Sequence, residues 1–278
     1  ELKDVIEADK TCDLIVFGQH GAGLNTPDLL AFGKHRKSIW VQWWFDLLMT
    51  NIGPPLVEQP LYKQWSSTLR AMDLVFVKER GMLAEYKANG IKARWLDQGI
   101  PSWIAPAHYD DAPQFDILMF GTASKAYKSR CADVHALAAA GAKVRWIGRP
   151  GSAVPRIAGV DMAPWVPVKD LHKEIANAKV VLSVDFRHDL DGYWSDRLWL
   201  AMASGAAVLR RSSPGLPVLP IEVYRDSDNL VPVACSLLTN EGRLTDLRLR
   251  AADFALGTQT YEHRAAELIE MVQAEGMI

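Results

Sequence analysis

The chain has 278 residues, of which 49% are hydrophobic and 23% charged, so it can form one large domain or two ordinary ones with a buried core. Its formal net charge of −2 at pH 7 argues against a broad electrostatic nucleic-acid surface but leaves a local one open. The cysteines Cys12, Cys131 and Cys235 lie far apart without a CxxC pair, which indicates a reducing, cytoplasmic compartment and no zinc site, and no apolar run approaches the ~18 residues of a membrane helix.

Apolar runs alternate with helix-like segments along the first third of the chain. The expected strands are Asp13–Gly18, Ser38–Trp44, Asp73–Lys78 and Lys92–Leu96. The expected helices are Glu1–Lys10, Pro27–Phe32, Tyr62–Ala71 and Gly81–Ala88. This alternation predicts a parallel sheet with right-handed crossovers. The glycine-rich turn Gln19–Asn25 fits either a phosphate loop or a plain strand-end turn, because it lacks the GxGxxG spacing.

A second alternating series follows a proline-rich linker, Ile100–Gln114. Its expected strands are Phe115–Gly121, Lys143–Gly148, Gly159–Met162, Lys179–Val184 and Ala206–Leu209. Its expected helices are Ser129–Ala140, Asp170–Ala178, Ser195–Ser204, Arg243–Leu256 and Thr260–Gln273, and Glu222–Asn240 is expected to be irregular. Two α/β halves in tandem predict two doubly wound domains, with ligands beyond the carboxyl ends of the strands and in the cleft between the domains.

The stretch Tyr193–Leu209 predicts a helix, a stop and a short strand. Ser195 is a suitable N-cap, and Gly205 suits the left-handed residue that closes a helix. The helix N-terminus is a candidate anion site because of its free N–H groups and its dipole. Arg197 in the first turn opposes that dipole, so we expect it to have a partner, either a phosphate or one of the aspartates Asp191 and Asp196.

The segment Leu200–Val208 (LAMASGAAV) resembles the close of the donor-binding helix of GT-B glycosyltransferases, most closely the spore-maturation-protein type and its group 1 relatives. Leu96–Pro106 is similar to the end of their N-terminal domain. Phe120–Thr122 looks like the first strand-to-loop turn of their donor domain, and Trp165–Pro167 like the segment that cradles the donor base. The resemblance covers most of the chain and implies two tandem Rossmann-like α/β domains with a cleft between them.

The resemblance also implies a domain plan. Residues 1–105 are expected to form an acceptor domain, residues 106–258 a nucleotide-sugar donor domain, and residues 259–278 a helix that crosses back to the N-terminal domain. Family members usually carry another strand or two before the one at Asp13, so the acceptor domain is expected to be truncated at its start.

A nucleotide-sugar donor leaves a diphosphate, and without a metal the growing negative charge needs fixed cations and N–H donors. The resemblance places a basic residue in the loop after Gly121 for this purpose, and Arg197 is the leading diphosphate ligand. The candidate residues are Gly121, Thr122, Lys125, Lys128, Arg130, Arg149, Ser183, Ser195 and Arg197. The alternatives are solvated surface charges, structural ion pairs and a turn-forming serine.

Base and ribose recognition involve a departure from the family pattern. Trp165 and Val166 lie in the segment that the resemblance assigns to the donor base. Relatives usually have a glutamate that binds the donor ribose just before Ala-Met-Ala, and many have a second one eight residues earlier; these positions are Leu200 and Gly192 here. Asp196, one turn before Leu200 on the same helix face, is the candidate substitute.

His20 and Asp46 are the candidate catalytic residues of the acceptor side. His20 follows the first strand and is placed to bind the transferred sugar or assist the acceptor hydroxyl. Asp46 follows an aromatic run that resembles a phrase in the family's N-terminal domain, and partial desolvation would suit a general base. The alternatives are a loop histidine without chemistry and a capping or ion-paired aspartate. An aromatic acceptor platform, with some members in the core, is expected from Trp40, Trp43, Trp44 and Trp65.

The triplet Asp189-Leu190-Asp191 matches the DxD motif that binds a metal in the other large glycosyltransferase fold. Because the two-domain repeat argues against that fold, no metal site is expected. The resemblance implies no cofactor either, since a nucleotide sugar such as a UDP-sugar is a substrate.

The leading hypothesis is a hexosyltransferase that moves a sugar from a nucleoside-diphosphate sugar to an acceptor hydroxyl. The sequence leaves three kinds of acceptor open. They are a sugar, a lipid-linked or small molecule, and a hydroxymethylated DNA base as in compact viral GT-B enzymes. Two other classes remain: a non-catalytic nucleotide- or sugar-binding module, which the missing glutamate favours, and an epimerase of the same two-domain fold.

Overall fold

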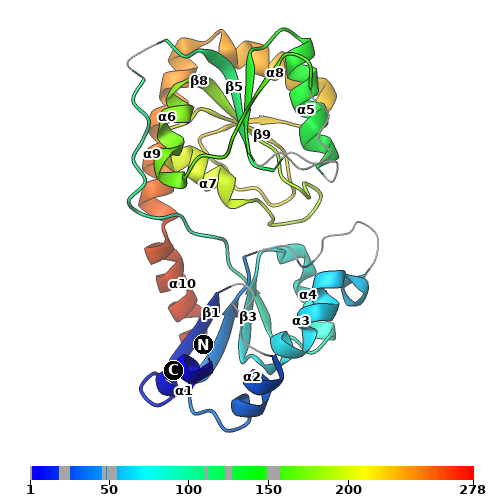
Figure 1. Cartoon of the computed structure of the whole chain (residues 1–278), viewed down its shortest axis with the longest axis vertical. Helices are drawn as coiled ribbons and strands as arrows, with labels where there is room; N and C mark the ends of the chain where they lie inside the picture. The colour runs from blue at the N-terminus through cyan, green and yellow to red at the C-terminus, as the bar shows by residue number, and fades with distance from the viewer. Residues whose placement is uncertain are drawn as a thin grey trace. The chain divides into compact units, whose positions relative to one another are not determined.

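The computed structural model contains two compact units, each built on its own parallel sheet (Figure 1). It describes residues 2–18, 26–45, 48, 55–109, 112–122, 127–148 and 157–278. Unit 1 comprises Glu1–Gln98, Leu190–Tyr193 and Arg264–Ile278, and unit 2 comprises Gly99–Asp189 and Trp194–His263.

The sheet of unit 1 has the strand order β1-β2-β3-β4, and all neighbouring strands are parallel. Its strands are β1 (Leu14–Gly18), β2 (Ile39–Trp43), β3 (Leu74–Val77) and β4 (Ala93–Trp95). Its helices are α1 (Leu2–Ala8), α2 (Thr26–Gly33), α3 (Pro60–Ala71), α4 (Leu83–Ala88) and the short 3-10 turns η1 (Leu56–Glu58) and η2 (Arg80–Met82). Figure 1 shows α3 and α4 on one side of this sheet.

The other face of the unit 1 sheet is covered by the last helix, α10 (Tyr261–Ala274) (Figure 1). Leu268 and Val272 of α10 belong to a buried cluster with side chains of β2, β3 and the segment after β4. The other buried members of this cluster are Val41, Trp43, Leu74, Phe76 and Leu96. A central parallel strand needs apolar cover on both faces, and α10 supplies one of them.

The sheet of unit 2 has the strand order β10-β9-β8-β5-β6-β7 and is parallel throughout. Its strands are β5 (Phe115–Phe120), β6 (Val144–Ile147), β7 (Val160–Ala163), β8 (Ala178–Ser183), β9 (Val208–Arg211) and β10 (Glu222–Tyr224). The strands β5, β6 and β7 lie side by side in chain order, and the next strand, β8, pairs with the other edge of β5. The pair β5–β8 is therefore the topological switch point, where doubly wound sheets bind their ligands.

Helices cover both faces of the unit 2 sheet. They are α5 (Lys128–Ala139), η3 (Val168–Asp170), α6 (Leu171–Ala176), α7 (Asp196–Ala203), α8 (Ser227–Leu238) and α9 (Glu241–Thr258). Figure 1 shows α5 and α8 on one face and α6 and α9 on the other, and α7 packs against α9. The core between α5, α8 and the strands includes Val134, Leu137, Leu230, Met119 and Trp146.

Every strand expected from the sequence is confirmed, with its ends displaced by no more than two residues. The expectation for Glu222–Asn240 was wrong, because this stretch forms β10 and α8. Pro232 lies inside α8 and hides the helical pattern, whereas the carboxylate of Asp226 caps the helix by accepting a 2.9 Å hydrogen bond from the Asn229 N–H. Apart from a bridge between Ile100 and Thr260, residues 100–109 and 112–114 form no helix or strand.

The aromatic acceptor platform is not supported for three of its four tryptophans. Trp40, Trp43 and Trp44 are buried in unit 1, where Trp40 makes an edge contact with Phe17 at 5.2 Å between ring centroids. Only Trp65 of this set is half-buried. Trp40 and Trp43 lie in β2 and Trp44 follows it directly, so these three rings contribute to the core of unit 1.

None of the helices in the described segments is long and apolar enough to cross a membrane.

The packing of α10 predicts unequal effects at two neighbouring positions. Leu268 is 4% exposed and Ile269 is 43% exposed. We expect Leu268→Ala to lower the free energy of unfolding by about 2–5 kcal/mol, because it leaves a cavity beneath α10. Ile269→Ala, the matched control, should cost less than about 1 kcal/mol. Urea denaturation of both variants tests this, and equal losses would show that α10 is not anchored through Leu268.

Candidate functional site

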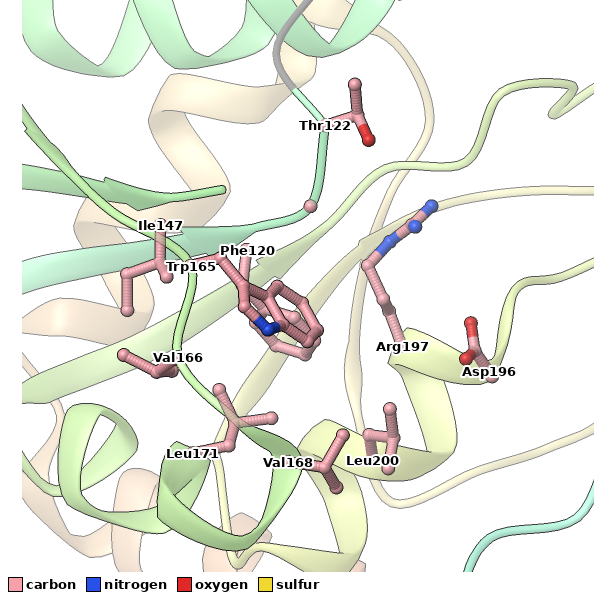
Figure 2. Close-up of a pocket in the computed structure, with 11 residues that line it drawn as sticks. Phe120, Thr122, Ile147, Trp165, Val166, Val168, Leu171, Asp196, Arg197 and Leu200 are labelled. Carbon is pink, nitrogen blue, oxygen red and sulfur yellow. The ribbon is translucent and has the colours of Figure 1, made fainter. Parts of the chain in front are cut away.

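A pocket of about 430 Å³ opens beyond the carboxyl ends of β5, β6 and β7 in unit 2, beside the N-terminus of α7 (Figure 2). Phe120 and Ile147 end two of these strands, and Trp165 follows the third. The lining residues are Phe120, Gly121, Thr122, Ile147, Trp165, Val166, Val168, Leu171, Asp196, Arg197 and Leu200. The strand order places this pocket next to the switch point, so its position follows from the topology of the sheet.

The pocket has an apolar end and a polar end. Figure 2 shows Ile147, Val166 and Leu171 on the side of the Trp165 ring that is away from Arg197, and Val168 next to Leu200. Trp165 is 52% exposed, so much of its ring surface is free to stack on a flat group. The charged side chains among the described lining residues are Asp196 and Arg197, both in the first turn of α7. The site therefore suits a ligand that is flat and apolar at one end and anionic at the other.

The turn after β5 allows close contact between chain segments. Gly121 has φ +126°, a conformation that side chains rarely adopt, and a Cβ built there would lie 3.1 Å from Cδ of Arg197. The Gly121 carbonyl accepts a 2.9 Å hydrogen bond from Nε1 of Trp146. A Cβ on Gly148 would lie only 2.1 Å from the same carbonyl oxygen. Both glycines are needed for Arg197 and the two strand ends to approach one another.

Arg130 lies beneath the pocket. Its side chain on α5 is 0% exposed. Its guanidinium donates hydrogen bonds to the carbonyl of Thr122 at 2.7 Å and to that of Val184 at 3.0 and 3.2 Å, and it stacks on the Tyr127 ring at 4.2 Å. Arg130 thus joins the ends of β5 and β8, the two strands of the switch point.

The N-terminus of α7 is held by a carboxylate that follows β8. Ser195 occupies the N-cap position as expected, but its hydroxyl makes no capping bond and has no hydrogen-bond partner among the described residues. Instead the backbone N–H of Ser195 donates a 3.1 Å hydrogen bond to Oδ1 of Asp185. At the other end Gly205 closes the helix with φ +74°, as the sequence predicted.

Asp185 forms a buried ion pair with Arg210 of β9, at 2.5 Å between Oδ2 and Nη2. Arg210 also donates hydrogen bonds to the hydroxyls of Ser183 and Ser213, at 3.3 and 3.2 Å. Burial alone would raise the pKa of Asp185, but the charge and hydrogen bond of Arg210, the charge of Arg197 and the N–H of Ser195 bring it below its ordinary value of 3.8. Asp185 therefore stays ionised under α7.

Arg197 is half-buried and has no hydrogen bond or ion pair with any residue in the part of the chain that the structure describes. Asp191, one of its expected partners, instead holds Arg80 through two 2.9 Å hydrogen bonds within unit 1. Neither expected aspartate partner therefore engages the guanidinium. Arg197 is a cation at a helix N-terminus, beside a pocket, and its N–H donors have no acceptor among the described residues.

Six of the fourteen predicted site residues line the pocket. Lining the pocket are Gly121, Thr122, Trp165, Val166, Asp196 and Arg197. Lys128 is exposed at the start of α5, and Ser183 is buried against Arg210. The predicted residues that lie outside the described segments are His20, Asp46, Lys125 and Arg149, together with the turn Gln19–Asn25.

Asp185 and Arg210 were missed from the sequence. Each is a charged residue within or directly after an apolar strand, a position where a charge is rarely buried unless it is paired. That signal could have identified both residues as members of a buried pair, although not as partners of each other.

The DxD triplet is engaged by arginines. Asp189 accepts two 2.7 Å hydrogen bonds from Arg187, and Asp191 is held by Arg80. No group of three or more His, Cys, Asp or Glu side chains in the described segments is arranged to hold a metal ion.

Comparison with known proteins shows the family. The family model described as "Glycosyl transferase-like" matches residues 107–270, more than half of the chain. No curated protein matches. The narrower resemblance to the spore-maturation-protein type stays a prediction.

Solved structures show the fold. HepE of Anabaena, in complex with UDP and glucose, is 12% identical with a TM-score of 0.66, covering 98% of this chain and 81% of its own. A glycosyltransferase from Rickettsia africae is 11% identical with a TM-score of 0.65, covering 98% and 79%. A mutant of T4 phage BGT in complex with UDP-glucose is 14% identical with a TM-score of 0.55, covering 99% and 85%. The predicted fold class, two tandem Rossmann-like α/β domains of GT-B type, is confirmed.

The Asp185–Arg210 pair predicts a pH-dependent contribution to stability. Because the pKa of Asp185 is lowered by folding, its contribution is present above the ordinary value of 3.8 and is lost as pH falls through the lower folded value. We expect Asp185→Asn to cost about 3–5 kcal/mol at neutral pH, since Arg210 is then buried without a counter-charge. The difference from the wild type should shrink between about pH 4 and pH 2.

Urea midpoints across this range measure that difference. The exposed Asp253→Asn is the control and should differ little from the wild type at any pH. A loss for Asp185→Asn that stays constant down to pH 2 would show that the carboxylate charge is not what stabilises α7.

Proposed function

The chain belongs to the glycosyl transferase-like family, and we propose that it transfers a hexose from a nucleoside-diphosphate sugar to an acceptor hydroxyl without a metal. The observation that carries this proposal is the pocket at the switch point of unit 2, where an exposed tryptophan faces an arginine at a helix N-terminus that has no hydrogen bond or ion pair among the described residues. The complexes of similar structures with UDP or UDP-glucose support a uridine nucleotide as the first donor to test.

In this proposal Arg197 binds the diphosphate. Breaking the bond between the sugar and the diphosphate leaves negative charge on the phosphate oxygens, and a fixed cation stabilises that charge more in the transition state than in the ground state. The free N–H groups at the start of α7 add their dipole to the same place. Lys128, together with Lys125 and Arg149, is proposed to supply further positive charge around the leaving group.

The proposal does not need a metal, because these cations and N–H donors take over its electrostatic role. Asp189 and Asp191, which a DxD mechanism would require as metal ligands, are each hydrogen-bonded to an arginine. The donor base is proposed to stack on Trp165 beside Val166, and Asp196 to accept a hydrogen bond from a donor hydroxyl. Arg130 is proposed to position the Thr122 turn, since its own donors are used by backbone carbonyls.

We further propose that residues 106–258 form the donor domain, residues 1–105 the acceptor domain, and residues 259–278 a helix that braces the latter. The contacts of Leu268 and Val272 with β2 and β3 support the role of that helix. His20 and Asp46 are proposed to act on the acceptor side, one of them as the base that removes the proton of the acceptor hydroxyl.

The role of Arg197 can be tested by substitution. A thermal-shift screen of nucleoside diphosphates and their sugars first identifies the donor, because a bound ligand raises the melting temperature. We expect Arg197→Ala to lower kcat for release of the nucleoside diphosphate by about 10²–10³-fold. Arg225→Ala, an exposed arginine of the same unit, should leave the rate unchanged.

Two outcomes would count against the proposal. Full activity of Arg197→Ala would show that the leaving diphosphate is stabilised elsewhere. A wild type that binds the donor nucleotide but neither transfers nor hydrolyses the sugar would instead identify a non-catalytic binding module.

The acceptor-side residues predict a different kinetic effect. We expect Asp46→Asn or His20→Ala, whichever removes the base, to lower kcat by about 10²–10⁴-fold while KM for the donor stays nearly constant. Asp13→Asn, an exposed aspartate of unit 1, is the control. Steady-state assays at saturating donor measure this, and wild-type kcat in both variants would place the base elsewhere.

A further inference from the structure

The two ends of the pocket determine where the sugar ring of a bound nucleotide must lie. A nucleoside diphosphate carries its base and its diphosphate on opposite sides of the ribose. If the base stacks on Trp165 and the diphosphate binds Arg197, as the proposed function has it, the ribose lies between them. Arg197 and Leu200 are three residues apart on α7, so they share one face of the helix about one turn apart. The wall next to the ribose is therefore formed by Leu200.

That wall is apolar. Leu200 is 9% exposed and Phe120 is 5% exposed, and the part of each that reaches the surface lines the pocket. Val168 lines the pocket next to them, and Figure 2 shows Val168 and Leu200 side by side in this view. A hydroxyl that faces these side chains finds no side-chain hydrogen-bond partner on them, and burying it there would cost free energy.

The polar side chains among the described lining residues lie elsewhere. In Figure 2, Asp196 is on the side of Arg197 that faces away from Trp165, and Thr122 is on the far side from Leu200. Asp196 precedes Leu200 by one helical turn, but it lies beyond Arg197 and so at the diphosphate end of the pocket.

From this arrangement we propose that the site does not distinguish ribose from 2′-deoxyribose, so that the donors of this chain include sugars carried on 2′-deoxyribonucleoside diphosphates. The proposal rests on the proposed function for the placement of the base and the diphosphate. A site that hydrogen-bonds a hydroxyl rejects the analogue that lacks it, whereas an apolar wall has little basis for such rejection. Leu200 is the residue that determines this tolerance.

The wild type alone tests the proposal. Isothermal calorimetry with UDP and 2′-deoxy-UDP, and with GDP and 2′-deoxy-GDP, gives the ratio of dissociation constants for each pair. We expect the deoxynucleotide of the better-bound pair to bind within about fivefold of the ribonucleotide. A preference for the ribonucleotide above about fivefold would overturn the proposal. Failure of all four nucleotides to bind would count against the proposed function itself.

Substitutions locate the effect. Leu200→Glu, or Leu200→Gln if the first variant unfolds, places a hydrogen-bond acceptor at the wall and should raise the preference for the ribonucleotide to about tenfold or more. Leu249→Glu, on an exposed position of α9, should keep the wild-type ratio. Asp196→Asn should also keep the ratio, even if both affinities fall.

Two results with these variants would overturn the proposal. An unchanged ratio in folded Leu200 variants would show that the ribose does not face this residue. A selective loss of ribonucleotide binding in Asp196→Asn would show that Asp196 reads the 2′-hydroxyl.

Discussion

The buried ion pair between Asp185 and Arg210 is the interaction on which the pocket of unit 2 depends. Two opposite buried charges at 2.5 Å are stable only while both are present, because either one alone would be an uncompensated buried charge. The pair fixes Asp185 where its second oxygen receives the Ser195 N–H. This hydrogen bond holds the first turn of α7, and with it Arg197, at the edge of the pocket. It forms without a ligand.

Glycine and arginine have complementary roles around this turn. Gly121 and Gly148 lack side chains where backbone and Arg197 come closest, so the strand ends can approach the helix. Arg197 interacts with the charge of Asp185 but makes no hydrogen bond or ion pair in the described part of the chain, at a place where its own helix dipole disfavours a cation. A bound anion would supply the hydrogen-bond acceptors that Arg197 lacks among the described residues, which is why we interpret this arrangement as a site and not as a packing feature.

The alternation of apolar strands and helices was sufficient to predict every strand of the two sheets except the edge strand β10, because parallel strands buried on both faces leave a continuous apolar run. The pocket residues Trp165 and Arg197 were found through family resemblance and helix-start chemistry. The sequence was least informative where pairing over a long separation decides the outcome: Asp185 with Arg210, and Arg130 with the carbonyls of Thr122 and Val184. Local patterns contain no signal for which distant partner neutralises a charge.

The hydrogen bonds of Arg130 to two different segments restrict how these segments can move. A planar guanidinium reaches carbonyls that follow two different strands, and its fork leaves little freedom to rotate about either one. A lysine could satisfy only one of them at a time and would let the loops shift independently. The segments that follow β5 and β8 should therefore stay fixed relative to each other when a ligand binds. Adjustment to different ligands must then come from the other lining residues of the pocket.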